Sequence, residues 1–218
     1  MNNESIKLRT EVFGCESCTH ITDFARPSSG GPFYKFPPLI GGEKGVPLLF
    51  IGINPRRTKS NFELHDWLMS SPENFSKLSR NQQADGCSYI SPGAKEEHYH
   101  CHAIVVKELF GSTTAFESKA AVTELLLCAS ESGAGLLHLE KSRCAEKFLP
   151  RVIKIVQPRV VVAVGSTVRK HLERHFNNII KIKIIEMDHP SYLHGLNDDE
   201  KRQRLEPTIN ELRRALNS

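Results

Sequence analysis

Two uninterrupted apolar runs constrain the fold of this chain more than any other feature of its sequence. Residues 47–54 read PLLFIGIN and residues 159–164 read RVVVAV, and neither run alternates apolar with polar side chains. Strands of this kind are buried on both faces, which is typical of a parallel sheet covered by helices on each side. We therefore expect an α/β fold in which strands and helices alternate.

The remaining sequence supplies further elements for such a fold. Helices are expected at 61–83, 96–110, 145–156, 167–176 and 199–216, and shorter strands at 122–127 and 179–187. Residues 14–46, rich in Gly, Pro and Ser, are expected to form a long loop. Right-handed crossovers between the strands predict three α/β/α layers around a central four-stranded parallel sheet.

Length and composition are typical of a single soluble domain spanning residues 1–218. The 218 residues are 39% hydrophobic and 25% charged, and no stretch approaches the roughly 20 apolar residues of a membrane helix. The first residues show no basic-then-apolar signal pattern. We expect a cytoplasmic monomer with reduced thiols and no membrane partner. The net charge of +4 is too small to indicate nucleic acid by itself.

Four of the six cysteines fall into two pairs, Cys15/Cys18 and Cys128/Cys144. Two short C-x2-C knuckles would suggest a zinc ribbon, but fifteen residues separate the second pair. That spacing resembles the ligand spacing of a [4Fe–4S] cluster, although zinc stays an alternative. Cys87 and Cys101 are competing partners for the first pair. A separate zinc site on the histidines of 97–102 is not expected, because alternate positions on a helix point in different directions.

Three segments are expected at the carboxyl ends of the strands, where parallel sheets bind their ligands. The first is GINPR at 52–56, in which the Pro turn would aim Asn54 into the crevice. The second is HPSY at 189–192, which offers an imidazole and a hydroxyl group. The third opens a helix near Ser166, where backbone N–H groups can bind phosphate. Taken alone, each of these segments is as consistent with an ordinary structural turn as with a functional site.

In this order, the motifs resemble those of the uracil-DNA glycosylase superfamily, specifically its iron–sulfur branch. The resemblance covers about two thirds of the chain, and residues 57–117 look like a mostly helical insertion. It implies a glycosylase that flips a deaminated or damaged base out of DNA and hydrolyses its N-glycosidic bond in base excision repair. It also implies DNA as the partner, association with the nucleoid, and a structural [4Fe–4S] cluster on Cys15, Cys18, Cys128 and Cys144.

The resemblance further implies a role for each site residue. Asn54 would position the attacking water, and His189 would stabilise the departing base. The base would contact Gly52, Ile53, Glu124 and a stacking aromatic, for which Tyr99 is the first choice and His98 or Phe62 the alternatives. The DNA would be contacted by Arg56, Ser166, Ser191, and by Tyr192 or Leu193 as a wedge in the base stack.

Glu124 stands where that family usually has an Asn that reads the uracil edge. An ionised carboxylate donates no hydrogen bond, so uracil O4 would repel it unless the group is protonated in a desolvated site. An ionised Glu124 would instead suit two donors, as in guanine-like purines, or pair with Arg56 or Arg57. The substrate is therefore left open between uracil and a deaminated purine. A non-catalytic DNA- or nucleotide-binding module with a structural metal site is the alternative function.

Overall fold

A four-stranded, all-parallel sheet forms the centre of the computed structural model of the chain. The structure describes residues 3–18, 20, 24, 35, 45–53, 97–111, 116–128, 130, 143–179 and 181–218. The strands lie in the order β2-β1-β3-β4. Their bounds are β1 Leu48–Gly52, β2 Ala120–Glu124, β3 Val160–Val164 and β4 Lys183–Met187. The predicted α/β class with a central parallel sheet is confirmed.

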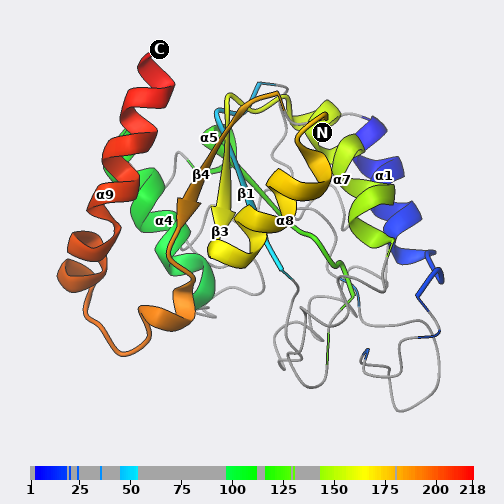
Figure 1. The fold of residues 1–218 in the computed structure, drawn as a ribbon, viewed down its shortest axis with the longest axis horizontal. Helices are drawn as coiled ribbons and strands as arrows, with labels where there is room; N and C mark the ends of the chain where they lie inside the picture. The colour runs from blue at the N-terminus through cyan, green and yellow to red at the C-terminus, as the bar shows by residue number, and fades with distance from the viewer. Residues whose placement is uncertain are drawn as a thin grey trace.

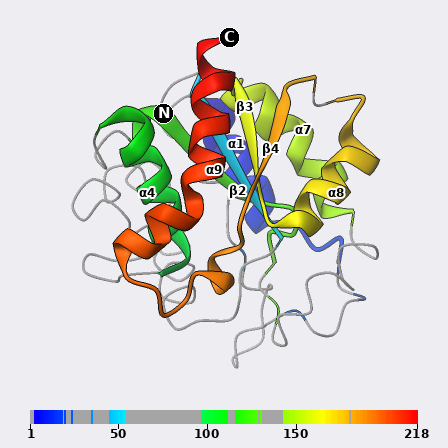
Figure 2. The same ribbon diagram turned by 60° about the vertical axis from the view of Figure 1, so that its left-hand side comes forward.

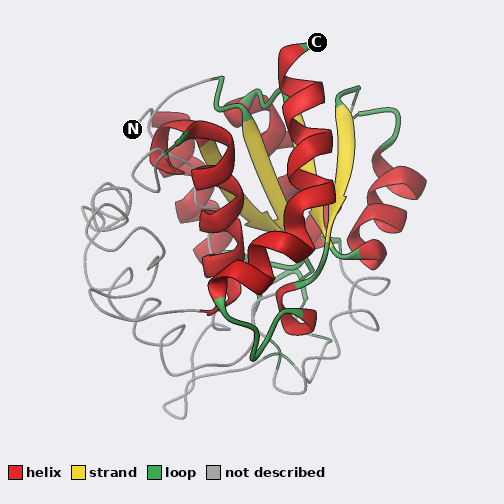
Figure 3. Cartoon of the chain, turned by 90° about the vertical axis from the view of Figure 1, so that its left-hand side faces the viewer, coloured by secondary structure: helices red, strands yellow, loops and turns green. Residues whose placement is uncertain are grey.

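Helices cover both faces of the sheet and complete the three layers (Figure 1). One face packs against α1, α7 and α8, and the other against α4 and α9 (Figure 2). Figure 3 shows the sheet between these two helical layers. The bounds are α1 Asn3–Phe13, α4 Glu97–Phe110, α5 Phe116–Lys119, α7 Cys144–Val156, α8 Ser166–Phe176, the 3-10 turn η2 Pro190–Tyr192 and α9 Asp198–Asn217.

Alternating side chains along the central strands divide the interior into two cores. Leu49 and Ile51 of β1 pack with α1, α7 and α8, whereas Leu48 and Phe50 pack with α4 and α9. All residues of β1 and β3 are buried, because a helical layer covers each face. The two apolar runs of the sequence are therefore the two central strands of the sheet.

The helices expected at 96–110, 145–156, 167–176 and 199–216 are α4, α7, α8 and α9, each within one residue at either end. Local signals explain this agreement. A capping box between Asn197 and Glu200 starts α9, and α7 ends at Gln157 in the left-handed conformation. Within the described part of the chain, no helix combines the length and apolar character that crossing a membrane requires.

Other boundaries differ from expectation. β2 begins at Ala120 and ends at Glu124, so the apolar residues at 125–127 follow the strand instead of belonging to it. β4 begins only at Lys183, because Ile179 is half exposed in the turn that follows α8. The helix α1 was not predicted, since its apolar positions are few and the buried Arg9 stands among them. The helix expected at 61–83 lies outside the described residues.

Candidate active site

The carboxyl ends of the strands meet at one edge of the sheet, marked by the arrowheads of β3 and β4 in Figure 1. Glu124 at the end of β2 is in register with Gly52 at the end of β1. Val164 at the end of β3 is in register with Met187 of β4. Ligands of open parallel sheets bind outside this edge. The edge is therefore the candidate site, as the sequence predicts.

The Glu124 side chain lies directly over the backbone of Gly52. A Cβ atom built on Gly52 would come within 2.0 Å of Oε2 and 2.7 Å of Cδ of Glu124. Glu124 is only 5% exposed. Among the described residues, none forms a hydrogen bond or ion pair with its carboxyl group. Glycine at position 52 is thus what leaves room for a buried carboxyl group at the sheet edge.

Burial sets the protonation state of Glu124. It raises the pKa of this carboxyl group to about 8, and no charge among the described residues contributes to the shift. At neutral pH the group is mostly a neutral acid that carries an O–H donor beside an acceptor oxygen. The ion pair considered with Arg56 or Arg57 involves residues outside the described ranges.

We expect Gly52→Ala to destabilise the fold by about 1–3 kcal/mol, the usual cost of overpacking a buried position. Because the new methyl group would overlap the Glu124 carboxyl group, adding Glu124→Ala should recover most of the loss. Urea unfolding of both single variants and the double variant measures this coupling. Gly14→Ala is the control, since its Cβ would meet only the Thr10 carbonyl oxygen at 3.6 Å. Strictly additive losses would contradict the contact.

His189 follows β4 and lies beside the glycine that ends the other central strand. A Cβ atom on Gly165 would be 3.4 Å from the His189 Cβ. Gly165 has a φ of 94°, which favours glycine, and its N–H donates to the Met187 carbonyl oxygen at 2.7 Å. Glu124 and His189 therefore each lie against a glycine at the end of a central strand.

The hydrogen bonds of His189 define its tautomer. The backbone N–H of Ser191 donates to Nδ1 at 3.2 Å, and the Ser191 hydroxyl oxygen lies 2.8 Å from the same nitrogen. A ring nitrogen that accepts an amide hydrogen bond carries no proton, so the neutral ring holds its proton on Nε2. His189 is therefore arranged as a donor through Nε2.

The loop after β4 is anchored on both sides of this histidine. Asp188 pairs with Arg204 of α9 at 2.9 Å, and Leu193 is fully buried in the core under α4 and α9. Tyr192 between them is 76% exposed. Of the two candidates for a DNA wedge, only Tyr192 reaches the surface. Leu193 packs in the core, which favours Tyr192 over Leu193 as the wedge.

The two serines predicted to contact phosphate are exposed at the same edge. Ser191 lies in η2, and Ser166 is the first residue of α8. No side chain caps the start of α8, so its first turn presents backbone N–H groups to the surface. This geometry is compatible with binding an anion.

Several predicted site residues fall outside the description. Asn54 and Arg56 follow the last described residue of this segment, Ile53, and the side chain of Tyr99 on α4 is likewise not described.

One turn further along α4, His102 is buried, and its ring lies 4.6 Å from that of Phe50. Sequence reasoning missed His102, because its position facing β1 depends on how α4 packs.

The predicted ligand cysteines line a single pocket. Cys15 and Cys18 follow α1, Cys128 follows β2, and Cys144 opens α7. All of them belong to or pack against the core under α1, α7 and α8. Cys101 is buried in the core on the opposite face of the sheet, so it is not a partner of the first pair. Cys87 lies outside the described residues.

Two lysines accompany these thiols. Lys147 Nζ lies 3.4 Å from Cys15 Sγ. Lys35 is buried and forms an antiparallel bridge with Cys128. Their positive charges favour thiolates at this pocket. Lys147 could have been noticed in the sequence, because it follows Cys144 by one helical turn. Lys35 offers no such signal, since its place depends on the bridge.

A set of four cysteine thiols is compatible with an iron–sulfur cluster. Within the described ranges, no group of three or more His, Cys, Asp or Glu side chains is arranged to hold one metal ion. The four thiols line one pocket. Their number matches a [4Fe–4S] cluster, in which each iron takes one cysteine. Burial raises the pKa of the Cys128 and Cys144 thiols, which favours the neutral thiol unless a positive group stabilises the thiolate.

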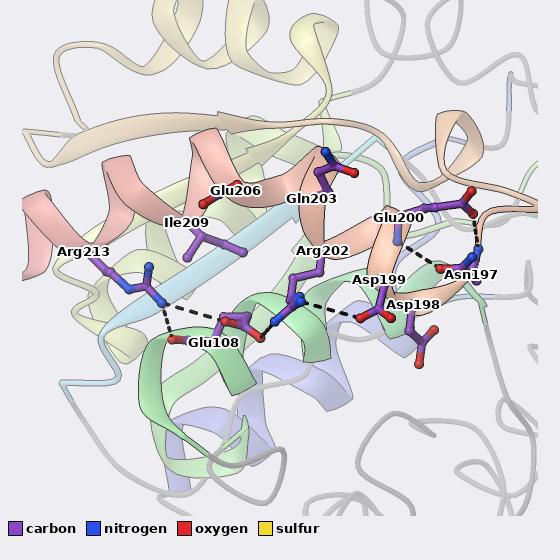
Figure 4. Close-up of a pocket in the computed structure, with 10 residues that line it drawn as sticks. All are labelled: Glu108, Asn197, Asp198, Asp199, Glu200, Arg202, Gln203, Glu206, Ile209 and Arg213. Atoms are coloured by element: carbon purple, nitrogen blue, oxygen red, sulfur yellow. Dashed lines mark hydrogen bonds and ion pairs between the residues drawn. The ribbon is translucent and has the colours of Figure 1, made fainter.

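A groove of about 650 Å³ between α9 and the end of α4 is not the active-site candidate (Figure 4). Its charges pair with one another, since Arg202 and Arg213 both approach Glu108. Five carboxyl groups and two guanidinium groups line it, which gives a surface that repels phosphate. The strand ends therefore remain the candidate site.

Comparison with known proteins bears on this site. A family model described as the Uracil DNA glycosylase superfamily matches residues 40–213. The match includes all four strands and begins after the Cys15/Cys18 pair, so it does not cover the four cysteines as a set. Among curated proteins, no match was found.

Proposed function

Because the chain belongs to the uracil-DNA glycosylase superfamily, we propose that it is a monofunctional DNA glycosylase of base excision repair. Such an enzyme flips its target base out of the stack, and water then replaces the base on the sugar. The observation that carries the proposal is a histidine at the strand ends whose ring is set to donate from Nε2.

His189 stabilises the leaving base in this proposal. Cleavage of the N-glycosidic bond leaves positive charge on the sugar and negative charge on the base. An N–H donor aimed at a base oxygen stabilises that negative charge without transferring its proton. The Ser191 amide, which donates to Nδ1, keeps the ring in the required tautomer.

The remaining roles surround the same sheet edge. Asn54, two residues after the end of β1, would hold the attacking water through its amide oxygen. The backbone of Gly52 and Ile53 would approach the base, Tyr99 would stack on it, and Glu124 would contact its polar edge. The water would attack the sugar as the base departs.

DNA would lie across the carboxyl edge of the sheet. Arg56, Ser166 and Ser191 would contact phosphates, because a cation and exposed donors bind the backbone without reading sequence. Tyr192, which is 76% exposed, would fill the space that the flipped base leaves. A monomer would suffice for these contacts.

The iron–sulfur cluster has a structural role in this proposal. Cys15, Cys18, Cys128 and Cys144 would hold it, and it would tie the segment after α1 to α7 and to the segment after β2. The cluster supplies cross-links between distant parts of the chain. Base release itself is assigned to residues at the strand ends.

The test is a base-release assay with the purified holoprotein. Labelled oligonucleotides carry uracil, hypoxanthine or xanthine, and hot alkali reveals abasic sites. We expect alkali-dependent cleavage of at least one substrate and intact strands before alkali. Strand breaks without alkali would contradict the monofunctional assignment. Tight binding with no product from any substrate would favour the non-catalytic module.

A further inference from the structure

The Glu124 carboxyl group is buried at the sheet edge and has no hydrogen-bond partner among the described residues. Buried polar groups in folded proteins almost always find a partner. This group lies against Gly52 at the edge where ligands of parallel sheets bind. A ligand bound at this edge would supply the carboxyl group with a hydrogen-bond partner.

We propose that Glu124 binds the target base as a neutral carboxylic acid, facing an edge that pairs a carbonyl oxygen with a ring N–H. Uracil and hypoxanthine both present such an edge. The inference rests on the proposed glycosylase function. The acid O–H would donate to the base carbonyl, and the acid C=O would accept from the ring N–H.

The surroundings of Glu124 favour the neutral acid. Its β1 neighbour is a glycine, which brings no charge. Burial is the cause that raises the pKa of the carboxyl group to about 8. Among the described residues, no charge on a neighbouring element contributes to that pKa. The titratable side chains on those elements include Cys101 and His102 on α4, Lys119 on α5, Cys144 and Lys147 on α7, and His189 beyond β4.

As a neutral acid, Glu124 would not by itself discriminate between uracil and cytosine. Its proton can sit on either oxygen, so the same group fits the amino group and ring nitrogen of cytosine. Rejection of cytosine therefore falls to other groups in the pocket. An ionised Glu124 would behave differently, because two acceptors require two donors on the base.

The test compares wild type, Glu124→Gln and Glu124→Ala in single-turnover release of uracil and of hypoxanthine from single-stranded oligonucleotides between about pH 6 and 9.5. The wild-type rate should fall as the pH rises above about 8, approaching tenfold per pH unit as the acid ionises. Glu124→Gln should not show this fall, because its amide offers a donor and an acceptor at every pH. Glu124→Ala should be slower than wild type by about tenfold or more below pH 8, and the difference should shrink at higher pH because the alanine variant has no acid to ionise.

Two results would overturn the inference. One is a Gln variant whose rate falls with pH as the wild-type rate does, and the other is a wild-type rate that rises through this range. The second result depends only on the pH profile of the wild-type enzyme. The inference can therefore still be tested if the Glu124→Gln variant fails to fold. If the wild type releases no base at any pH, the proposed function itself is wrong. If the enzyme releases uracil but the wild-type and Glu124→Gln rates fall with pH in the same way, only the role of Glu124 is overturned and the proposed function stands.

Discussion

Replacing His189 with alanine should slow base release by roughly 10²–10³-fold, the effect of removing one preorganised donor to a developing anion. The expectation follows from the ring geometry. Nδ1 accepts the Ser191 amide at 3.2 Å, which leaves the proton on Nε2 for the departing base. Single-turnover kinetics on the best substrate from the release assay would measure the loss, and fluorescence anisotropy would show whether DNA affinity is retained.

Matched variants separate this role from general damage to the fold. His175→Ala removes an exposed histidine of α8 whose ring contacts His171, and it should leave the rate unchanged. Ser191→Ala keeps the backbone amide that holds the His189 tautomer, so it should lose much less activity than His189→Ala. A His189→Ala enzyme within threefold of wild type would remove the histidine from the mechanism.

Replacing Cys128 with alanine should abolish the broad visible absorption of an iron–sulfur protein and lower the free energy of unfolding by roughly 4 kcal/mol. That figure is the chain-entropy effect expected when a cross-link closing a loop of about a hundred residues is lost. The physical basis is the shared pocket, which joins cysteines near the start of the chain to cysteines after β2 and at the start of α7. Absorption spectra, iron and sulfide content and denaturant unfolding under anaerobic conditions would measure the effect.

Cys101→Ala is the control for loss of a buried thiol. Cys101 is 1% exposed but lies in the core on the other face of the sheet. Its replacement should cost about 1 kcal/mol and leave the colour intact. A colourless wild-type protein that holds one zinc ion per chain would contradict the iron–sulfur assignment. Equal colour in wild type and Cys128→Ala would exclude Cys128 as a ligand.

Elements governed by local signals could be predicted from the sequence. The boundaries of α7 and α9 follow from amphipathic spacing and capping, which act within a few residues. The end of β2 at Glu124 could not be read in this way, because the apolar residues after it are as buried as those within it. Pairing with β1, a distant segment, decides where that strand stops.

The candidate site was likewise predictable only where local or topological signals act. Parallel topology alone predicts that the segments after β1, β3 and β4 share one edge, and the structure brings Gly52, Gly165 and His189 there. The burial of Leu193 could not be predicted, since an apolar residue in a surface loop and one that packs under α9 look alike in sequence. Asn54 and Tyr99 stay predictions, because their side chains lie outside the described residues.

The sequence by itself determined that this chain forms a parallel α/β sheet and which residues stand at its carboxyl edge. Periodicity, glycine and proline encode these features locally. Only the tertiary structure decided that Glu124 is buried against Gly52, that the Ser191 amide sets the tautomer of His189, and that Cys101 lies across the sheet from the other thiols. Burial and partners set the protonation state of a side chain, and both depend on residues far apart in the sequence.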